Sequence, residues 1–299
     1  MYRTAKTAKR RDAFTLVEML VVIAIILAIA ALAAAFAPRV SDSQNLTRAV
    51  DNLEQWLLTA KMRAKRDRLA TGVRFVQAPG DAAGIYSQIQ YVQQPDSLSG
   101  IPNVATLVSA GNGTVTFSGV DFSLGGAVLA QPLVQFGDYL EVRDGGVYFI
   151  SAASGPTTLQ LNGTGYDTSL TIAAPGTSNY RILRQARILI GEEPLTLPNN
   201  FAVNFNTIPG TTSAGSNVAL SPSYLYYEIL FSPTGAVVGS NAGQGALFVT
   251  VYDQTMNPFD LNKVGIVAVQ CRTGFIGAYS VYSAANPFYF AETGQESGL

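Results

Sequence analysis

The sequence predicts an α+β protein in which one long N-terminal helix precedes a head built from antiparallel strands. Residues 19–37 are 19 consecutive apolar residues, enough for a helix that crosses a membrane. Residues 41–70 place apolar residues at helical spacing, and from Val73 onward the apolar residues alternate with a period of two. We therefore expect a helix that is first transmembrane and then amphipathic, packed on an antiparallel β-sheet.

Composition narrows the range of functions. The chain has 299 residues, 13% of them charged, and contains no histidine, which excludes Ser-His-Asp and Cys-His catalysis and every histidine-based metal site. Cys271 is the only cysteine, so no intrachain disulfide can form. Five basic residues and one acidic residue lie within residues 1–13. By the positive-inside rule this segment stays in the cytoplasm and the rest of the chain crosses the membrane.

The apolar segment permits more than one interpretation. A secretory signal peptide would end at the small-residue sequence of residues 35–37, although Pro38 follows it directly. A plain single-pass anchor fits the length better but leaves Glu18 unexplained. An ionised carboxylate inside a bilayer costs about 2.5 to 3.5 kcal/mol or more, so it needs a partner or access to the interface.

A short string of residues suggests a third interpretation. Residues 10–20 read Arg-Arg-Asp-Ala-Phe-Thr-Leu-Val-Glu-Met-Leu and closely resemble the class III signal of type IV pilins and type II secretion pseudopilins. The resemblance implies that prepilin peptidase cleaves between Ala13 and Phe14, removes residues 1–13 as a basic leader, and methylates the new amine of Phe14. It also implies that Glu18 pairs with the Phe14 amine of a neighbouring subunit during assembly. Alternatively, Glu18 simply extends to the lipid headgroups.

The second half of the helix is amphipathic. A stripe of apolar residues follows the helical period, while charged residues occupy the other faces. We assign residues 14–38 to the transmembrane half and residues 39–72 to the amphipathic half, and we expect Gly72 to end the helix. The stripe consists of Leu46, Val50, Leu53, Leu57, Ala60 and Ala64.

Basic residues cluster near the end of this helix. They form a candidate patch for nucleic acid, or else a solvated face that complements the negative end of the helix dipole. No aromatic residues are interleaved with them, which favours the second interpretation. The patch comprises Lys61, Arg63, Lys65, Arg66 and Arg68, with Arg74 following in the first expected strand.

The head, residues 73–277, reads as short strands separated by turns. Residues 73–76 and 85–92 predict two strands joined by a hairpin at residues 79–81. The middle region, about residues 100–195, predicts a small inserted β-meander or barrel, and residues 199–223 predict a surface loop. Strands are expected in the inserted region at residues 104–117, 133–136, 139–142, 146–150 and 157–161, and residues 180–190 should lead back to the main sheet.

A second resemblance appears in the last third of the chain. A strand ends in Phe-Ser-Pro-Thr-Gly at residues 231–235, and strands at residues 246–252 and 264–271 follow. Pro233 presets a turn dihedral and Gly235 allows a positive φ, so the chain can reverse tightly. This arrangement is similar to the GspH/FimT-type pseudopilin domain. Residues 278–299 remain as a C-terminal tail.

No residues assemble into a recognisable catalytic set, and we expect the protein not to be an enzyme. Glu192 and Glu193 read as a solvated turn. Asp253, Asp260 and Glu228 would supply oxygen ligands for calcium, but they follow no recognisable loop spacing. We therefore expect no cofactor, with calcium as the alternative.

The resemblances together imply a structural subunit of a type II secretion pseudopilus or type IV pilus-like filament, most similar to a minor pseudopilin of the H type. Its partners would be other pilin or pseudopilin subunits, prepilin peptidase and the inner-membrane assembly platform. It would sit in the bacterial inner membrane by a single span, with its head in the periplasm or outside the cell. The alternatives are a DNA-binding minor pilin for uptake, a major pilin, and an enzyme tethered by a plain anchor.

Overall fold

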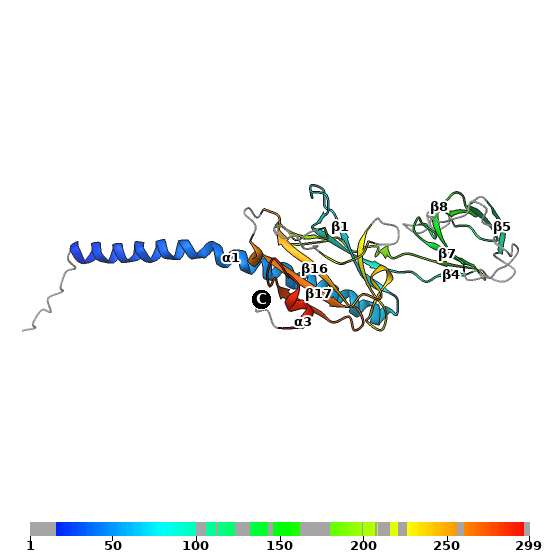
Figure 1. Cartoon of the computed structure of the whole chain (residues 1–299). Coiled ribbons are helices and arrows are strands. Elements are labelled where there is room, and N and C mark those ends of the chain that lie inside the picture. The colour runs from blue at the N-terminus through cyan, green and yellow to red at the C-terminus, as the bar shows by residue number, and fades with distance from the viewer. Residues whose placement is uncertain are drawn as a thin grey trace, which may run out of the picture. The chain divides into compact units, whose positions relative to one another are not determined.

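The computed structural model describes most of the chain (Figure 1). The chain divides into two compact units, Met1–Asn45 and Leu46–Leu299. The structure confirms the expected α+β class, because an N-terminal helix packs against antiparallel sheets. The described residues are 16–99, 106–111, 113–122, 132–142, 146–161, 180–198, 200–206, 208, 216–220, 226–255 and 260–295.

Helix α1 spans Leu16–Asp67 and continues through Pro38. Its large apolar side chains from Leu16 to Ile29 are solvent-exposed, with Leu16 at 81%. Among the residues whose positions are described, no helix combines the length and the apolarity that crossing a membrane requires.

The part of α1 that belongs to the second unit confirms the predicted apolar stripe. All six of its residues from Leu46 to Ala64 are buried, in one core with inward-facing residues of two sheets. The expected stop at Gly72 is wrong. The helix ends at Asp67, and Arg68 follows with a φ of 57°, the left-handed conformation that commonly terminates helices. Gly72 lies inside a strand, where an added Cβ would come 1.9 Å from the backbone oxygen of Ile229.

Two antiparallel sheets share this core. The first has the order β11-β3-β1-β14-β15, with β12 also paired to β3, and the second has the order β18-β17-β16-β13-β2. The strands of the first are β1 (Thr71–Val76), β3 (Gln88–Gln93), β11 (Arg187–Ile188), β12 (Leu195–Thr196), β14 (Tyr227–Phe231) and β15 (Val237–Val238). Those of the second are β2 (Ile85–Tyr86), β13 (Phe201–Asn204), β16 (Ala246–Asp253), β17 (Val264–Gln270) and β18 (Ile276–Ser280). Short 3-10 helices occur at Gly239–Asn241 and Leu261–Lys263.

The segment expected as one strand at residues 85–92 is divided between the two sheets. Strand β2 pairs with β13, whereas β3 pairs with β1. Ser87 separates them, and both its backbone N–H and its hydroxyl donate to the carboxylate of Asp81. This side-chain anchor fixes the point where the chain leaves one sheet and enters the other.

Two further segments carry structure where the sequence predicted a loop or a tail. Strand β13 lies within the expected loop at residues 199–223, because Phe201, Ala202 and Val203 are all buried. Strand β18 pairs with β17 and runs into the expected tail. Helix α3 (Tyr289–Thr293) follows (Figure 1). Phe288, directly before it, stacks on Phe248 with ring centroids 4.6 Å apart.

The middle region forms a separate sheet, here named the inserted module. Its seven strands have the order β4-β10-β7-β8-β9-β6-β5. They are β4 (Leu98–Ser99), β5 (Thr106–Gly111), β6 (Thr114–Ser118), β7 (Tyr139–Val142), β8 (Val147–Ala153), β9 (Thr158–Leu161) and β10 (Tyr180–Leu183). Inward residues such as Leu140, Ile150 and Ile182 from these strands bury one another in a core of their own. The sheet therefore curls over its own face, and β4 and β5 stay at its two edges as a half-barrel.

The inserted module differs from the prediction in two elements. The segment expected as one strand at residues 104–117 forms the two antiparallel strands β5 and β6. Residues 133–136 form no strand but a turn-rich approach to β7, in which the Asp138 N–H donates to the backbone oxygen of Gln135. The expected return strand at residues 180–190 is confirmed in two pieces. Strand β10 belongs to the module, and β11 belongs to the six-stranded sheet.

Candidate functional site

The N-terminal end of α1 carries the first candidate site. Glu18 lies in the first turn of α1 and is solvent-exposed, with the exposed apolar residues Val17 and Met19 beside it. A carboxylate in the first turn is favoured by the positive end of the helix dipole. Ala13 and Phe14, the expected cleavage position, lie outside the described residues. The predicted pairing of Glu18 with a neighbour's amine thus stays a prediction.

The candidate basic patch is largely engaged in contacts within the fold. The Lys61 ammonium donates to the backbone oxygens of Thr273 and Gly274, at 3.2 and 2.7 Å. Partial burial and the nearby charge of Lys65 lower the pKa of Lys61. These contacts give Lys61 a structural role in joining α1 to the turn after β17.

Two arginines of the same patch also form ion pairs. Arg63 Nη1 lies 2.8 Å from Glu192 Oε1, and its guanidinium lies 4.3 Å from the ring centroid of Tyr91. Arg66 pairs with the adjacent Asp67 at 2.6 Å. Glu192 therefore forms an ion pair with α1, and the expectation that it lies in a solvated turn without such a contact is wrong. Lys65 and Arg68 complete the patch, Arg68 at the left-handed position that ends α1.

Arg74 does not belong to a surface patch. It lies on β1 directly opposite Glu228 on β14, and both side chains are buried. Arg74 Nη2 lies 2.9 Å from Glu228 Oε2 and also donates to the backbone oxygen of Ala186 at 2.8 Å. Burial raises the pKa of Glu228, and the charge of Arg74 opposes that rise.

The three carboxylates considered for calcium have other contacts. Glu228 is held by Arg74, and Asp253 Oδ1 accepts hydrogen bonds from the backbone N–H and hydroxyl of Thr255. Asp260 precedes the short helix Leu261–Lys263. Across the described part of the chain, no three Cys, Asp or Glu side chains gather closely enough to hold a metal ion.

Pro233 and Gly235 lie in a hydrogen-bonded turn. The Gly235 N–H donates to Ser232 O, the Ser232 N–H donates to Ala236 O, and Gly235 adopts a φ of 95°. The strand that this turn opens is the short β15, which pairs with β14, whereas β16 joins the other sheet. An added Cβ at Gly274 would come 1.9 Å from Gly235 O, so the turn packs directly against the chain after β17.

Sequence reasoning missed a cluster of charged residues where the inserted module meets the six-stranded sheet. Asp138 is completely buried, and its Oδ2 lies 3.1 Å from Arg187 Nη2. Burial raises the pKa of Asp138, and two backbone N–H groups and Arg187 oppose the rise. The only local signal was a carboxylate directly after a glycine in a turn, which is common on surfaces.

The described chain combines an exposed apolar helix start, which carries an early carboxylate, with a helix that packs on antiparallel sheets. Comparison with protein families finds a match for the first of these parts. Residues 8–34 match the prokaryotic N-terminal methylation motif, which is a prepilin-type signal. The match covers the N-terminal segment alone. No curated protein and no solved structure matches the chain significantly.

The motif has direct consequences for the class of protein. It implies processing by prepilin peptidase and assembly with pilins. The motif is typical of membrane-anchored, exported pilin-like proteins, a class that is typically structural rather than enzymatic.

Proposed function

We propose that this chain is a minor pseudopilin, similar to the H type, in a type II secretion pseudopilus or a type IV pilus-like filament. The observation that carries the proposal is the position of Glu18. It falls within the matched motif at residues 8–34, in the first turn of α1, and is the fifth residue after the cleavage expected between Ala13 and Phe14.

Assembly in this proposal proceeds by helix packing. Residues 1–13 are removed, residues 14–38 lie in the bacterial inner membrane, and the head is exported to the periplasm or the cell exterior. The exposed apolar side chains between Leu16 and Ile29 supply the surface that neighbouring helices cover. Pairing Glu18 with the methylated amine of a neighbouring Phe14 sets the register, since either charge alone is costly to bury.

Two features of the head support a minor subunit over a major one. The Ser232–Ala236 hydrogen-bonded turn, with Pro233 and Gly235, resembles the turn of H-type pseudopilins. The seven-stranded inserted module adds bulk that would crowd a regularly repeated lattice. The partners in this proposal are other pseudopilins, prepilin peptidase and the inner-membrane assembly platform, and the proposal includes no cofactor.

DNA binding is not favoured as a second function. Lys61 and Arg63 are held by contacts within the fold, Arg66 pairs with the adjacent Asp67, and Arg74 is buried. A nucleic-acid surface needs several cations free to contact phosphates.

The mass of the N-terminus tests the proposal. Protein recovered from membranes of a host with prepilin peptidase should begin at Phe14 and carry one methyl group on its amine. An Ala13→Arg variant is the matched control and should retain residues 1–13, because a bulky charged side chain replaces the small one before the cleavage position. A wild-type protein that begins at Met1 or at Pro38 would contradict the proposal.

A further inference from the structure

The inserted module is connected to the six-stranded sheet by two neighbouring chain segments. Strand β3 leads out of the sheet to β4, and β10 leads back to β11. Strands β3 and β11 pair with Gln93 opposite Arg187, and β4 and β10 pair with Leu98 opposite Ile182, so the same register holds on both sides. Between them, residues 94–97 and 184–186 belong to no strand. The connection is therefore a two-stranded ribbon with a gap in its ladder.

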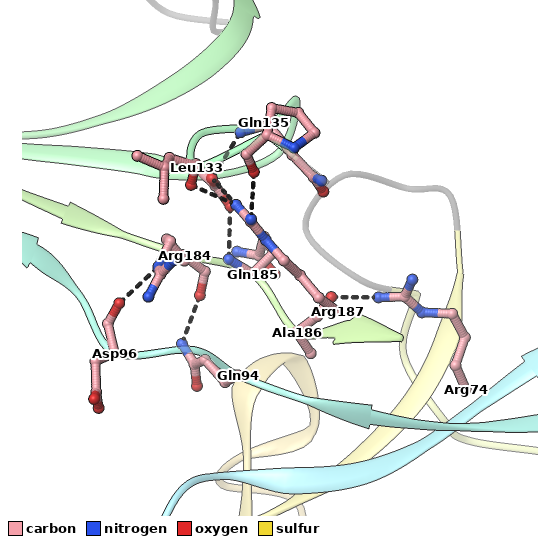
Figure 2. Close-up of polar contacts among 11 residues, drawn as sticks. Arg74, Gln94, Asp96, Leu133, Gln135, Arg184, Gln185, Ala186 and Arg187 are labelled. Carbon is pink, nitrogen blue, oxygen red and sulfur yellow. Dashed lines mark hydrogen bonds and ion pairs between the residues drawn. The ribbon is translucent and has the colours of Figure 1, made fainter. Parts of the chain in front are cut away.

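Side chains bridge this gap in place of the ladder. The Gln94 side-chain amide donates to the backbone oxygen of Arg184 at 2.9 Å, and Arg184 Nε donates to the backbone oxygen of Asp96 at 2.6 Å (Figure 2). A side-chain hydrogen bond of this kind can open by rotation of the side chain alone. Segments with few backbone hydrogen bonds are those that open most readily in folded proteins.

A buried carboxylate of the module holds the returning segment. Asp138 Oδ1 accepts a hydrogen bond from the Gln185 N–H at 2.7 Å, and Oδ2 accepts from the Gln135 N–H and from Arg187 Nη2. Arg187 also donates to the backbone oxygens of Pro132 and Leu133, at 2.5 and 2.7 Å. Gln185 and Arg187 are thus both bound to the module, as Figure 2 shows for Arg187 and Leu133.

The residue between them is bound to the six-stranded sheet instead. Ala186 is buried with Val92 and Leu230, and its backbone oxygen accepts from Arg74 (Figure 2). Arg74 is itself held by Glu228 across the sheet. The boundary between the inserted module and the six-stranded sheet therefore runs through residues 185–187. Ala186 is bound to the sheet, and its two neighbours are bound to the module.

The ion pair between Asp138 and Arg187 leaves one buried hydrogen-bond donor unsatisfied. Arg187 Nε is buried and has no hydrogen-bond partner among the residues that the structure describes. A buried charge with an unsatisfied donor is destabilising unless its remaining bonds compensate. If the Asp138 carboxylate is lost, the guanidinium gains free energy by moving into water, and this favours separation of the module over a closed contact with an unpaired charge.

We propose that the inserted module is hinged on the head at residues 94–97 and 184–186, and that the Asp138 carboxylate is the latch that closes the hinge. With the latch formed, the module is held in one orientation. With the latch open, the side-chain bridges of Gln94 and Arg184 release and the module reorients about the two connecting segments. The proposal concerns two parts of this chain and is independent of its function in a filament.

The test uses the full-length protein in detergent micelles, with Cys271→Ala as the background. Spin labels at Val147 on the module and Met62 on α1, both exposed, report the distribution of distances between the inserted module and the helix of the head. Hydrogen exchange of the Leu161 amide, which donates to Gly113 within the module, reports whether the module stays folded. Arg187→Gln is the deciding variant, because Arg187 lies on β11 and outside the module.

We expect Arg187→Gln to broaden the distance distribution while the Leu161 amide stays protected. The Gln185 amide, whose bond to Asp138 this change does not touch, should exchange about tenfold faster or more. Asp138→Asn should broaden the distribution to the same extent, and the double variant no further, because both residues form one latch. Arg181→Gln is the matched control, since it breaks the exposed pair with Glu141 inside the module and should leave the distribution narrow.

Two results would overturn the proposal. A narrow distribution in Arg187→Gln would mean that no latch exists at this contact. Loss of Leu161 protection in Arg187→Gln would mean that the contact maintains the fold of the module instead of its orientation. Should Asp138→Asn unfold the module, Arg187→Gln still decides between these outcomes.

Discussion

Arg74 and Glu228 face each other across β1 and β14 as a buried ion pair, with 2.9 Å between Nη2 and Oε2. Their relative side-chain exposures are 9% and 5%. The guanidinium also lies 4.1 Å from the ring centroid of Tyr226. The pair connects the six-stranded sheet to the segment that returns from the inserted module, through the Arg74 bond to Ala186.

Removal of the guanidinium should destabilise the head. Arg74→Met leaves the Glu228 carboxylate buried without its counter-ion, and such changes cost about 3 to 5 kcal/mol in the free energy of unfolding. Urea denaturation of the variant should show a lower midpoint. The double variant Arg74→Met with Glu228→Leu should recover much of the loss, because it leaves no unpaired charge. An Arg74→Met protein as stable as the wild type would show that the pair is not structural.

The same carboxyl group predicts a pH dependence. Burial raises the pKa of Glu228 above its usual value of 4.5, so the native state binds this proton more tightly than the unfolded state. The resulting stability is present below pH 4.5 and is lost as the pH rises through the raised pKa. The free energy of unfolding, followed by urea titration across the acid range, should therefore fall less with rising pH in Glu228→Gln. Parallel pH profiles for the two proteins would contradict the assignment.

The contact between two turns predicts a steric effect. Gly274→Ala should be strongly destabilising, because its Cβ would lie 1.9 Å from Gly235 O and Gly274 has a positive φ. Gly243→Ala is the matched control. Its φ of 88° gives it a comparable backbone strain of about 1 to 2 kcal/mol, but an added Cβ there meets nothing within 4 Å. The thermal unfolding temperature of Gly274→Ala should be well below that of Gly243→Ala. Equal losses of unfolding temperature would mean that the backbone strain of the positive φ, and not the steric overlap, causes the destabilisation.

Local periodicity predicted the parts of the fold that depend on neighbouring residues. The buried stripe from Leu46 to Ala64 and strands such as β7 and β16 follow from spacing, because one face of each element must meet the core. The division of one apparent strand at Ser87 did not follow. The residues on either side alternate alike, and only the contact with Asp81 separates them.

Ion pairs between residues far apart in the sequence could not be predicted from the sequence. Arg74 read as part of a surface patch and Glu228 as a calcium ligand, because each charge alone in a strand resembles an exposed residue. Asp138 and Arg187 are 49 residues apart, and no local spacing joins them. The turn at Pro233 and Gly235 was predictable for the opposite reason, since its geometry depends on four consecutive residues.

The single cysteine provides a probe of the core. Cys271 is buried, and burial raises the pKa of its thiol. The reactive species is the thiolate, so both effects slow modification. We expect a colorimetric disulfide reagent to label Cys271 only when denaturant unfolds the head, whereas a cysteine introduced at the exposed Met62 should react at once. Rapid labelling of Cys271 in the native protein would contradict its burial.

The last prediction concerns the position that carries the proposed function. Glu18→Ala should leave membrane insertion and cleavage before Phe14 intact, because the apolar segment and the residues around the cleavage position are unchanged. Incorporation into filaments should be greatly reduced, since the Phe14 amine of each neighbour would have no carboxylate to offset its burial. Glu18→Asp is the matched control and should retain part of the incorporation, because it keeps the charge and shortens the reach by one methylene. Immunoblots of sheared filament and membrane fractions measure both steps, and filaments that incorporate Glu18→Ala at the wild-type level would refute the registering role of this carboxylate.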